Sequence, residues 1–260
     1  MRRNLLWLGL LFAVWLLCSG QALADSLTER LEAFPDWHSK PAVQPSEGDL
    51  VYPTWLEGTW QMTSTLVEMQ APLAPELMTP GFEGNRQFLN QPVVAPIRFV
   101  TARAGSGRFL NRLLNTQVNV VSDRAFNSLS LARAYLGDDW VEAVKVDPNN
   151  PNRQITFLKD SQQLISTVTG RRVEIPSEND FVTTEIFQQF FRGGRPSVYL
   201  NQVENTTAYH HRSDLDSSPA IAAEQVTAIY LSPQDPDYFK AIDQPVALYR
   251  YQLEFRHAAL

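Results

Sequence analysis

Apolar and polar residues alternate along most of this chain with the period of two that is typical of β-strands with one buried face. The alternation is clear at residues 58–67, where four side chains share one face: Trp60, Met62, Ser64 and Leu66. The pattern predicts about nine strands, at 58–67, 93–103, 140–146, 153–158, 163–175, 181–191, 197–211, 226–231 and 246–257. Strands at this spacing, without alternating helices, indicate an all-β fold: one closed antiparallel β-barrel of about 8–10 strands.

One internal segment, residues 122–136, has a helical period instead. Its apolar side chains form a single stripe: Phe126, Leu129, Ala132 and Leu136. Ser122 or Asp123 can cap the first turn, and Gly137 is placed to end the helix. We expect this internal helix to pack against the barrel or to close one of its ends.

Two irregular segments flank the first strand. Residues 25–49 form an N-terminal extension, in which three apolar side chains have helical spacing before Pro35: Leu27, Leu31 and Phe34. Residues 70–92 contain four prolines and no periodicity, and a loop of this length is usually a lid or a packed Ω-loop. The remaining chain, residues 50–260, is expected to form the single barrel domain.

The N-terminus has the composition of a targeting segment. Arg2 and Arg3 precede an apolar run at 5–17, and Ala22-Leu23-Ala24 follows as a small-x-small cleavage sequence. This order predicts a secretory signal peptide at residues 1–24, formed by an N-terminal signal helix. Two tryptophans in the segment leave an uncleaved membrane anchor open as the alternative.

Composition and charge argue against several classes of binding partner. The net charge is −6, and removal of two arginines with the signal leaves 20 basic against 28 acidic residues, or −8. This balance argues against nucleic acids and anionic membrane surfaces as partners. The only cysteine, Cys18, lies within the signal, so disulfides cannot stabilise the mature chain. No other apolar run approaches membrane length, so the mature protein is expected not to span a membrane.

Gly58-x-Trp60 at a first strand, with an arginine on the last strand, resembles the lipocalin and fatty-acid-binding superfamily. The resemblance implies a calycin-type barrel in which the tryptophan packs at the closed end against an arginine from near the chain's end. Arg250 and Arg256 are the candidates, and aromatic residues flank Arg250. A guanidinium over an indole is a cation–π contact of about 0.5–2 kcal/mol.

Across residues from about 34 to the C-terminus, the chain also resembles an uncharacterised group of signal-bearing proteins of cyanobacteria and plant plastids. Three stretches carry this resemblance: Tyr52-Pro53-Thr54-Trp55-Leu56-Glu57-Gly58-Thr59-Trp60, Ala71-Pro72-Leu73-Ala74-Pro75 and Thr79-Pro80-Gly81-Phe82. It implies that the protein is exported to the thylakoid lumen or the periplasm, and it implies no established activity.

The leading functional prediction is a non-enzymatic protein that binds a hydrophobic small molecule, such as a lipid, an isoprenoid or a pigment, in the barrel lumen. The expected lining residues are Trp60, Met62, Leu66, Phe99, Phe187, Phe191 and Arg250. Glu185 shares a strand face with Phe181 and Phe187, so if that face is internal its carboxylate must find a partner or shift its pKa upward. Alternatively, these side chains simply fill the barrel.

The second functional prediction is a lumenal accessory or assembly protein that acts on a photosynthetic membrane complex through its outer surface. The candidate contact residues are Phe34, Trp37, Leu73 and Phe82. An enzyme is the third and least favoured prediction, because no nucleophile, base and orienting group can be assembled from the sequence. No cofactor is expected. His210 and His211, followed by two aspartates, suggest either a His/Asp metal site or a solvated turn, and we expect no metal site.

Overall fold

The computed structural model describes residues 26–103, 118–193, 198–212 and 218–258. The predicted signal peptide lies outside the described residues. The strands comprise Gln44–Pro45 (β1), Val51–Tyr52 (β2), Gly58–Gln70 (β3), Pro92–Arg103 (β4), Val118–Ser122 (β5), Val141–Asp147 (β6), Asn150–Leu158 (β7), Gln162–Ser177 (β8), Asp180–Arg192 (β9), Val198–His211 (β10), Ile221–Leu231 (β11) and Ala247–His257 (β12). Each of the nine predicted strands overlaps one of these, whereas β5 and the two short strands were not predicted.

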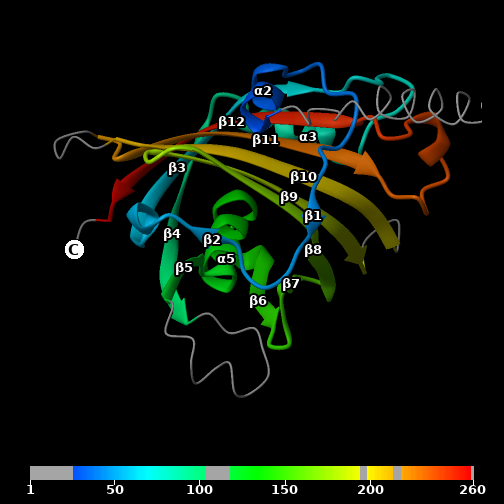
Figure 1. The fold of residues 1–260 in the computed structure, drawn as a ribbon. Coiled ribbons are helices and arrows are strands. Elements are labelled where there is room, and N and C mark those ends of the chain that lie inside the picture. Colours follow the sequence, from blue (N-terminus) through cyan, green and yellow to red (C-terminus); the bar gives the residue numbers. More distant parts are fainter. Residues whose placement is uncertain (1–25, 104–117, 194–197, 213–217, 259–260) are drawn as a thin grey trace, which may run out of the picture.

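All twelve strands belong to one curled antiparallel sheet (Figure 1). Its order is β2-β5-β4-β3-β12-β11-β10-β9-β8-β7-β6, with β1 paired to β8. Strands β6 to β12 follow one another as an up-and-down meander, and the last strand, β12, pairs with β3. The all-β antiparallel fold is therefore confirmed.

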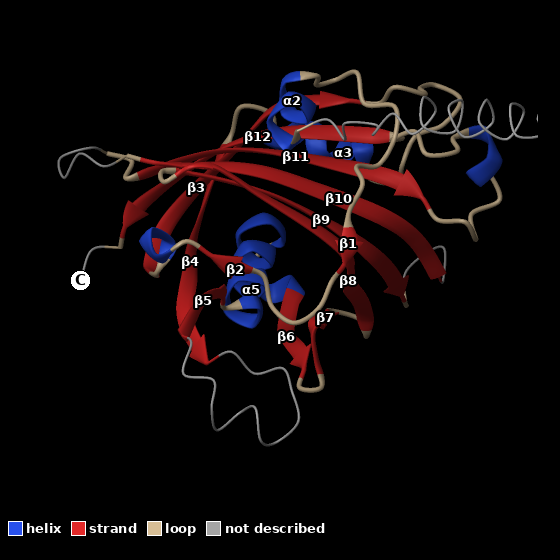
Figure 2. Cartoon of the chain, viewed as in Figure 1, coloured by secondary structure: helices blue, strands red, loops and turns tan. Residues whose placement is uncertain are grey.

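The sheet is a half-barrel and not the closed barrel that the sequence suggested. The end strands β2 and β6 do not pair with each other in the described part of the chain. After β5 the chain turns inward as helix α5 (Arg124–Leu136), which packs against β4, β6 and β7 on the concave side of the sheet (Figure 2). The helix thus occupies the place where a further strand pairing would close the barrel.

Helix α5 has the ends that the sequence predicts. The Asp123 carboxylate accepts a hydrogen bond from the backbone nitrogen of Phe126 at 3.2 Å and caps the first turn. The helix ends at Leu136, and Gly137 follows with a φ of 91°, which residues with a side chain rarely adopt. The predicted cap at Asp123 and the predicted end before Gly137 are therefore confirmed, whereas Ser122, which the prediction included in the helix, belongs to β5.

The face of α5 that contacts the sheet differs from the expected apolar stripe. The inward side chains come from positions four apart: Asn127, Leu131 and Tyr135. Asn127 is buried because its carboxamide accepts from the backbone nitrogen of Arg98 at 2.7 Å and donates to the backbone oxygen of Arg98 at 2.9 Å. Leu136, expected to be buried, is 52% exposed. An apolar stripe alone therefore does not identify the inward face of α5, because Asn127 lies on that face through hydrogen bonds to a strand backbone.

The N-terminal segment covers the convex face of the sheet (Figure 1). Helix α2 (Leu27–Glu32) begins with a capping box, in which Ser26 and Glu29 satisfy each other's backbone nitrogens. Four apolar side chains of this segment are buried against β9 to β12: Leu27, Leu31, Phe34 and Trp37. The extension is therefore part of the folded structure.

Several buried polar side chains, which we call the convex network, link α2 to the sheet. Arg30 forms a two-pronged ion pair with Glu204 of β10, at 2.7 and 2.8 Å, and the Glu204 side chain is fully buried. Tyr230 and Thr206 donate hydrogen bonds to the same carboxylate at 2.9 and 2.8 Å. The Arg30 guanidinium lies 3.9 Å from the centre of the Trp37 ring. Every carboxylate oxygen of Glu204 is thus paired within the protein.

Residues 71–91 cover one end of the concave face. This segment contains α3 (Phe82–Asn85) and the 3-10 turn η2 (Arg86–Phe88). The Phe82 side chain packs beside Leu66 and Tyr249, with its ring 5.7 Å from that of Tyr249. The long loop is therefore anchored by a buried aromatic residue.

The other 3-10 turns of the described residues are Thr54–Leu56 (η1), Asp138–Trp140 (η3) and Tyr238–Lys240 (η4).

Gly58-x-Trp60 does begin the first long strand, but the arginine expected beside Trp60 is not there. Gly58 has a φ of 126°, and the Trp60 indole stacks on His257 at 4.3 Å between ring centres. Arg250 and Arg256 lie seven positions and one position before His257 on β12, so both face the opposite side of the sheet. Arg250 pairs with Glu224 at 2.8 Å and Arg256 with Glu254 at 2.7 Å. Strand parity therefore excludes the expected Arg–Trp contact.

Candidate functional site

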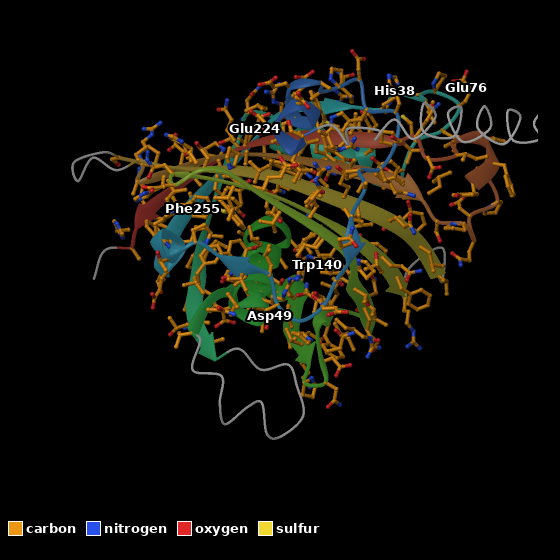
Figure 3. The ribbon with its side chains drawn as sticks, in the orientation of Figure 1. His38, Asp49, Glu76, Trp140, Glu224 and Phe255 are labelled. Carbon is orange, nitrogen blue, oxygen red and sulfur yellow. The ribbon has the colours of Figure 1, made fainter. Side chains whose placement is uncertain are left out.

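A cavity of about 290 Å³ lies between α5 and the strands β3, β4, β11 and β12, and we call it the first lobe. Its walls are largely apolar or aromatic and include Met62, Phe99, Leu131, Tyr251, Leu253 and Phe255 (Phe255 is labelled in Figure 3). At one side the Ser64 and Tyr135 hydroxyls are 3.0 Å apart and hydrogen-bonded. The inner side chains thus leave room that is not filled by the protein.

A second lobe of about 310 Å³ lies between α5 and the strands β7 to β11. Its lining is rich in hydroxyl and carboxamide groups, including Ser128, Gln154, Ser166, Thr183, Asn205 and Thr207. Three of these residues, Thr183, Asn205 and Thr207, come from β9 and β10, whose outward residues Val182 and Ala208 pack under α2. These two strands therefore present polar side chains to the lobe and apolar contacts to α2.

The two lobes are adjacent. They share six lining residues: Tyr52, Ser122, Asn127, Leu131, Tyr209 and Gln225. We call the two lobes together the chamber. One part of the chamber is mainly apolar and the other mainly polar, so its lining is amphipathic along its length.

Glu185 of β9, with Arg124 of α5 and Arg171 of β8, forms a charged wall that we call the concave network. Arg124 Nη2 lies 3.0 Å from Glu185 Oε1, and Arg171 donates to the same oxygen through Nε at 2.9 Å and Nη2 at 2.7 Å. Asp49, on the α5 side of the sheet (Figure 3), lies 3.8 Å from Arg124 Nε. The positive charges of the two arginines formally balance the negative charges of Glu185 and Asp49. The internal carboxylate thus finds partners, as the sequence required of it.

Tyr52 and Tyr209 line both lobes close to the concave network. Burial is the main cause that raises the pKa of each phenol above the usual value, and the charge of Glu185 adds to the effect. Both hydroxyls are therefore protonated at neutral pH. They can donate hydrogen bonds to a molecule in the chamber.

A third lobe of about 420 Å³ lies at the end of the concave face beneath residues 71–91. Gln189 is the single lining residue that it shares with the second lobe. Aromatic and carboxamide side chains dominate its lining, including Asn85, Gln162, Gln163, Phe191, Tyr199 and Tyr249. The loop that the sequence suggested as a lid therefore supplies one wall of a cavity.

The structure distributes the predicted lumen residues among these cavities. Met62 and Phe99 line the first lobe, Glu185 and Phe187 the second, and Phe191 the third. They share the concave face, as their parity predicted.

Three predicted lumen residues lie elsewhere. Trp60 is buried among core residues at one end of the first lobe, and Leu66 is buried beside Phe82. Arg250 is on the convex face, where its guanidinium lies 5.5 Å from the Phe34 ring. The lumen position predicted for Arg250 was therefore wrong, because this residue has outward parity on β12.

The residues proposed for a partner surface are mostly buried. Phe34, Trp37 and Phe82 are each at most 9% exposed and pack on the sheet or its end. Leu73 packs partly against Leu231 and neighbouring residues of the same end. In this conformation these side chains stabilise the fold and present little surface to a partner.

Sequence reasoning missed Arg124, Arg171 and Tyr52 as parts of the site. Arg171 lies opposite Glu185 in the β8–β9 pair, and only the actual pairing register, which the sequence does not show, identifies it. Arg124 and Tyr52 reach the site through tertiary packing alone.

The described residues contain neither a cluster of metal-ligating side chains nor a helix suited to span a membrane. Among those residues, no group of three or more His, Cys, Asp and Glu side chains is arranged to hold a metal ion. His210 pairs instead with Asp180 at 2.7 Å, and the two aspartates after it lie outside the described residues. None of the described helices combines the length and apolar character needed to cross a bilayer.

Comparison with known proteins gave one match. A family model described as a domain of unknown function (DUF6816) matches residues 45–259. This range contains every side chain that lines the three lobes, whereas α2 precedes it. Searches of curated proteins and of solved structures found no match.

Proposed function

The chain belongs to the DUF6816 family of unknown function, and we propose that its half-barrel binds an amphipathic small molecule in the chamber. The apolar part of the ligand lies in the first lobe, against Met62 and Leu253. The polar part points into the second lobe, toward Thr183 and the concave network. Lipids, isoprenoids and pigments with a polar end have this form.

The adjacency of a mainly apolar lobe and a mainly polar lobe carries the proposal. Ligand sites are typically concave, about 300–1,000 Å³ in volume, and lined by apolar groups with a few placed polar ones. The two lobes, at about 290 and 310 Å³ with six shared lining residues, fit this description. An apolar ligand alone would exclude water from the polar walls of the second lobe and offer no hydrogen bond in return, which disfavours it.

Filling the first lobe tests the proposal. Ser64 lies on the inner face of β3 and lines this lobe, while Thr65 lies on the outer face. The probe is 8-anilinonaphthalene-1-sulfonate, an apolar ring system with a polar end. We expect Ser64→Trp to weaken probe binding, measured by fluorescence titration, about tenfold or more, because the indole occupies the lobe.

Thr65→Trp is the matched control and should bind the probe as the wild type does. If Ser64→Trp lowers the melting temperature markedly, Thr227→Trp fills the same lobe from β11. Unchanged binding in both filled variants would reject the chamber as the site.

We also propose that the protein functions outside the cytoplasm, in the periplasm or the thylakoid lumen. The charged start, the apolar run and the small-x-small sequence before Asp25 support this. Intact-mass measurement of the protein from its own host should show an N-terminus at Asp25. A mature N-terminus at Met1 in a cytoplasmic fraction would overturn this proposal.

A further inference from the structure

The third lobe is separate enough from the chamber to take a ligand of its own. It is formed by the ends of β8, β9 and β10 together with residues 71–91, and Gln189 alone links it to the second lobe. Its volume of about 420 Å³ is the largest of the three. This size lies within the usual range for small-molecule sites.

Carboxamides are the main polar groups of this lobe. Five of them line it: Asn85, Gln162, Gln163, Gln189 and Asn201. Each carboxamide both donates and accepts hydrogen bonds, as does each hydroxyl group of a sugar. No Asp or Glu lines the lobe, and its one basic residue, Arg192, is exposed. The lining therefore matches an uncharged ligand with many hydroxyl groups better than an anion or a cation.

Aromatic rings supply the apolar part of the wall. The rings of Phe191 and Tyr199 lie 5.8 Å apart between centres, tilted by 41°, and Tyr249 lines the same lobe. Ring faces are apolar surfaces that can cover the C–H face of a sugar ring while its hydroxyls reach the carboxamides.

Two polar atoms of the lining have no partner. Asn201 is 5% exposed, and neither its Oδ1 nor the Tyr199 hydroxyl makes a hydrogen bond within the described residues. Burial is the main cause that raises the pKa of Tyr199, and the nearby Asn201 side chain lowers it in part, so the hydroxyl keeps its proton and lies close to Asn201. A buried polar group without a partner is unfavourable. One ligand hydroxyl could donate to Asn201 and accept from Tyr199, and would satisfy both.

We propose that the third lobe binds an uncharged, polyhydroxylated group, a sugar, with Asn201 and Tyr199 among its contacts. The sugar can be a free saccharide or the head group of a lipid whose tail lies in the chamber. The proposal does not depend on the chamber's ligand, because the two cavities share one residue.

The test uses the mature chain and a panel of methyl glycosides, the glucoside, galactoside and mannoside, followed by saturation-transfer NMR and calorimetry. At least one glycoside should bind. Asn201→Leu and Tyr199→Phe should each lower its affinity about tenfold, because each removes one hydrogen-bonding group from the contact. Neither should lower the melting temperature, since Asn201 Oδ1 and the Tyr199 hydroxyl make no hydrogen bond within the described part of the chain.

Gln202→Leu, on the outer face of the same strand, is the matched control and should leave affinity unchanged. A role of Asn201 and Tyr199 in stability alone would instead appear as a lower melting temperature with unaltered glycoside affinity. That outcome, or the absence of binding by every glycoside of the panel, would overturn the proposal.

Octyl β-glucoside, used below its micelle concentration, separates the two sources of sugar. If it binds more tightly than methyl β-glucoside and Ser64→Trp removes the difference, the sugar is the head group of a lipid. Equal affinities indicate a free saccharide. Loss of probe binding in the chamber with retained glycoside binding shows that the two sites are independent.

Discussion

Two buried glutamates on adjacent strands, Glu204 of β10 and Glu185 of β9, face opposite sides of the same sheet. Glu204 pairs with Arg30 in the convex network, is fully buried and lines no lobe of the cavity system described above. Glu185 pairs with Arg124 and Arg171 in the concave network and lines the second lobe. The same residue type thus occupies two different environments, one enclosed by protein and one beside a cavity.

The difference lies in the surroundings: the convex glutamate is enclosed by protein contacts, whereas the concave glutamate borders a cavity. On the convex face, the oxygens of Glu204 are saturated by Arg30, Tyr230 and Thr206, and apolar residues surround them. On the concave face, three contacts converge on Oε1 of Glu185 beside open space. A buried charge next to a polar cavity can still meet water or a ligand.

The largest expected effect is on the convex face. Glu204→Gln leaves the Arg30 guanidinium buried without a counter-charge, so it should lower the free energy of unfolding by about 3–5 kcal/mol. Urea denaturation measures this loss. Arg30→Met combined with Glu204→Leu should restore part of it, because an apolar pair carries no desolvation penalty. A loss below about 1 kcal/mol in Glu204→Gln would contradict the structural role of the network.

Glu185→Gln is expected to have a smaller effect, although Glu185 contacts two arginines. Water in the second lobe can solvate the guanidiniums that lose their counter-charge, so the loss should be about 2 kcal/mol. The same urea experiment compares the two variants directly. Equal losses would show that the second lobe is as dry as the convex network.

A pH effect should follow from the tyrosines of the chamber. The pKa values of Tyr52 and Tyr209 are raised in the folded state, so below about pH 10 both states keep these protons and the stabilisation is complete. Above that pH the unfolded state releases the protons first, and stability should fall by about 1.4 kcal/mol per pH unit for each buried phenol.

Denaturation at several pH values between 9 and about 11 checks this slope, and Tyr209→Phe should make it shallower. Full ionisation of all eight tyrosines near their ordinary pKa in the folded protein would contradict the burial of these residues.

The smallest effect is expected from a half-buried pair on the convex face. Arg250 and Glu224 are each about one third exposed and 2.8 Å apart. Because solvent screens such a pair, Glu224→Gln should change the unfolding free energy by less than about 1 kcal/mol. A loss comparable with that of Glu204→Gln would remove the distinction between the two kinds of pair.

Much of the fold was predictable because strand parity and capping are local properties. The alternation at 181–191 correctly grouped Glu185 with the internal phenylalanines, and Asp123 and Gly137 marked the ends of α5. Closure of the barrel was not predictable from this local pattern. It depends on whether the residues after β5 pair with a strand or turn inward as a helix, and the contacts of Asn127 with the backbone of β4 that hold this helix in place are tertiary.

The site was less predictable because it depends on register. In the β8–β9 pair, counting back from Ser177 opposite Asp180 would place Arg172 opposite Glu185. An irregularity between Glu174 and Ser177 shifts the pairing by one residue, so that Arg171 faces Glu185 instead. A shift of one residue moves a side chain to the other face, and single-strand patterns do not reveal it.

Native mass spectrometry of the protein purified from its own host tests the binding role of the concave face most directly. We predict a non-covalent small-molecule adduct on the wild type and on Thr65→Trp, and its loss from Ser64→Trp. Wild-type protein that is free of any adduct, and that still binds no amphipathic probe after purification, would contradict the account.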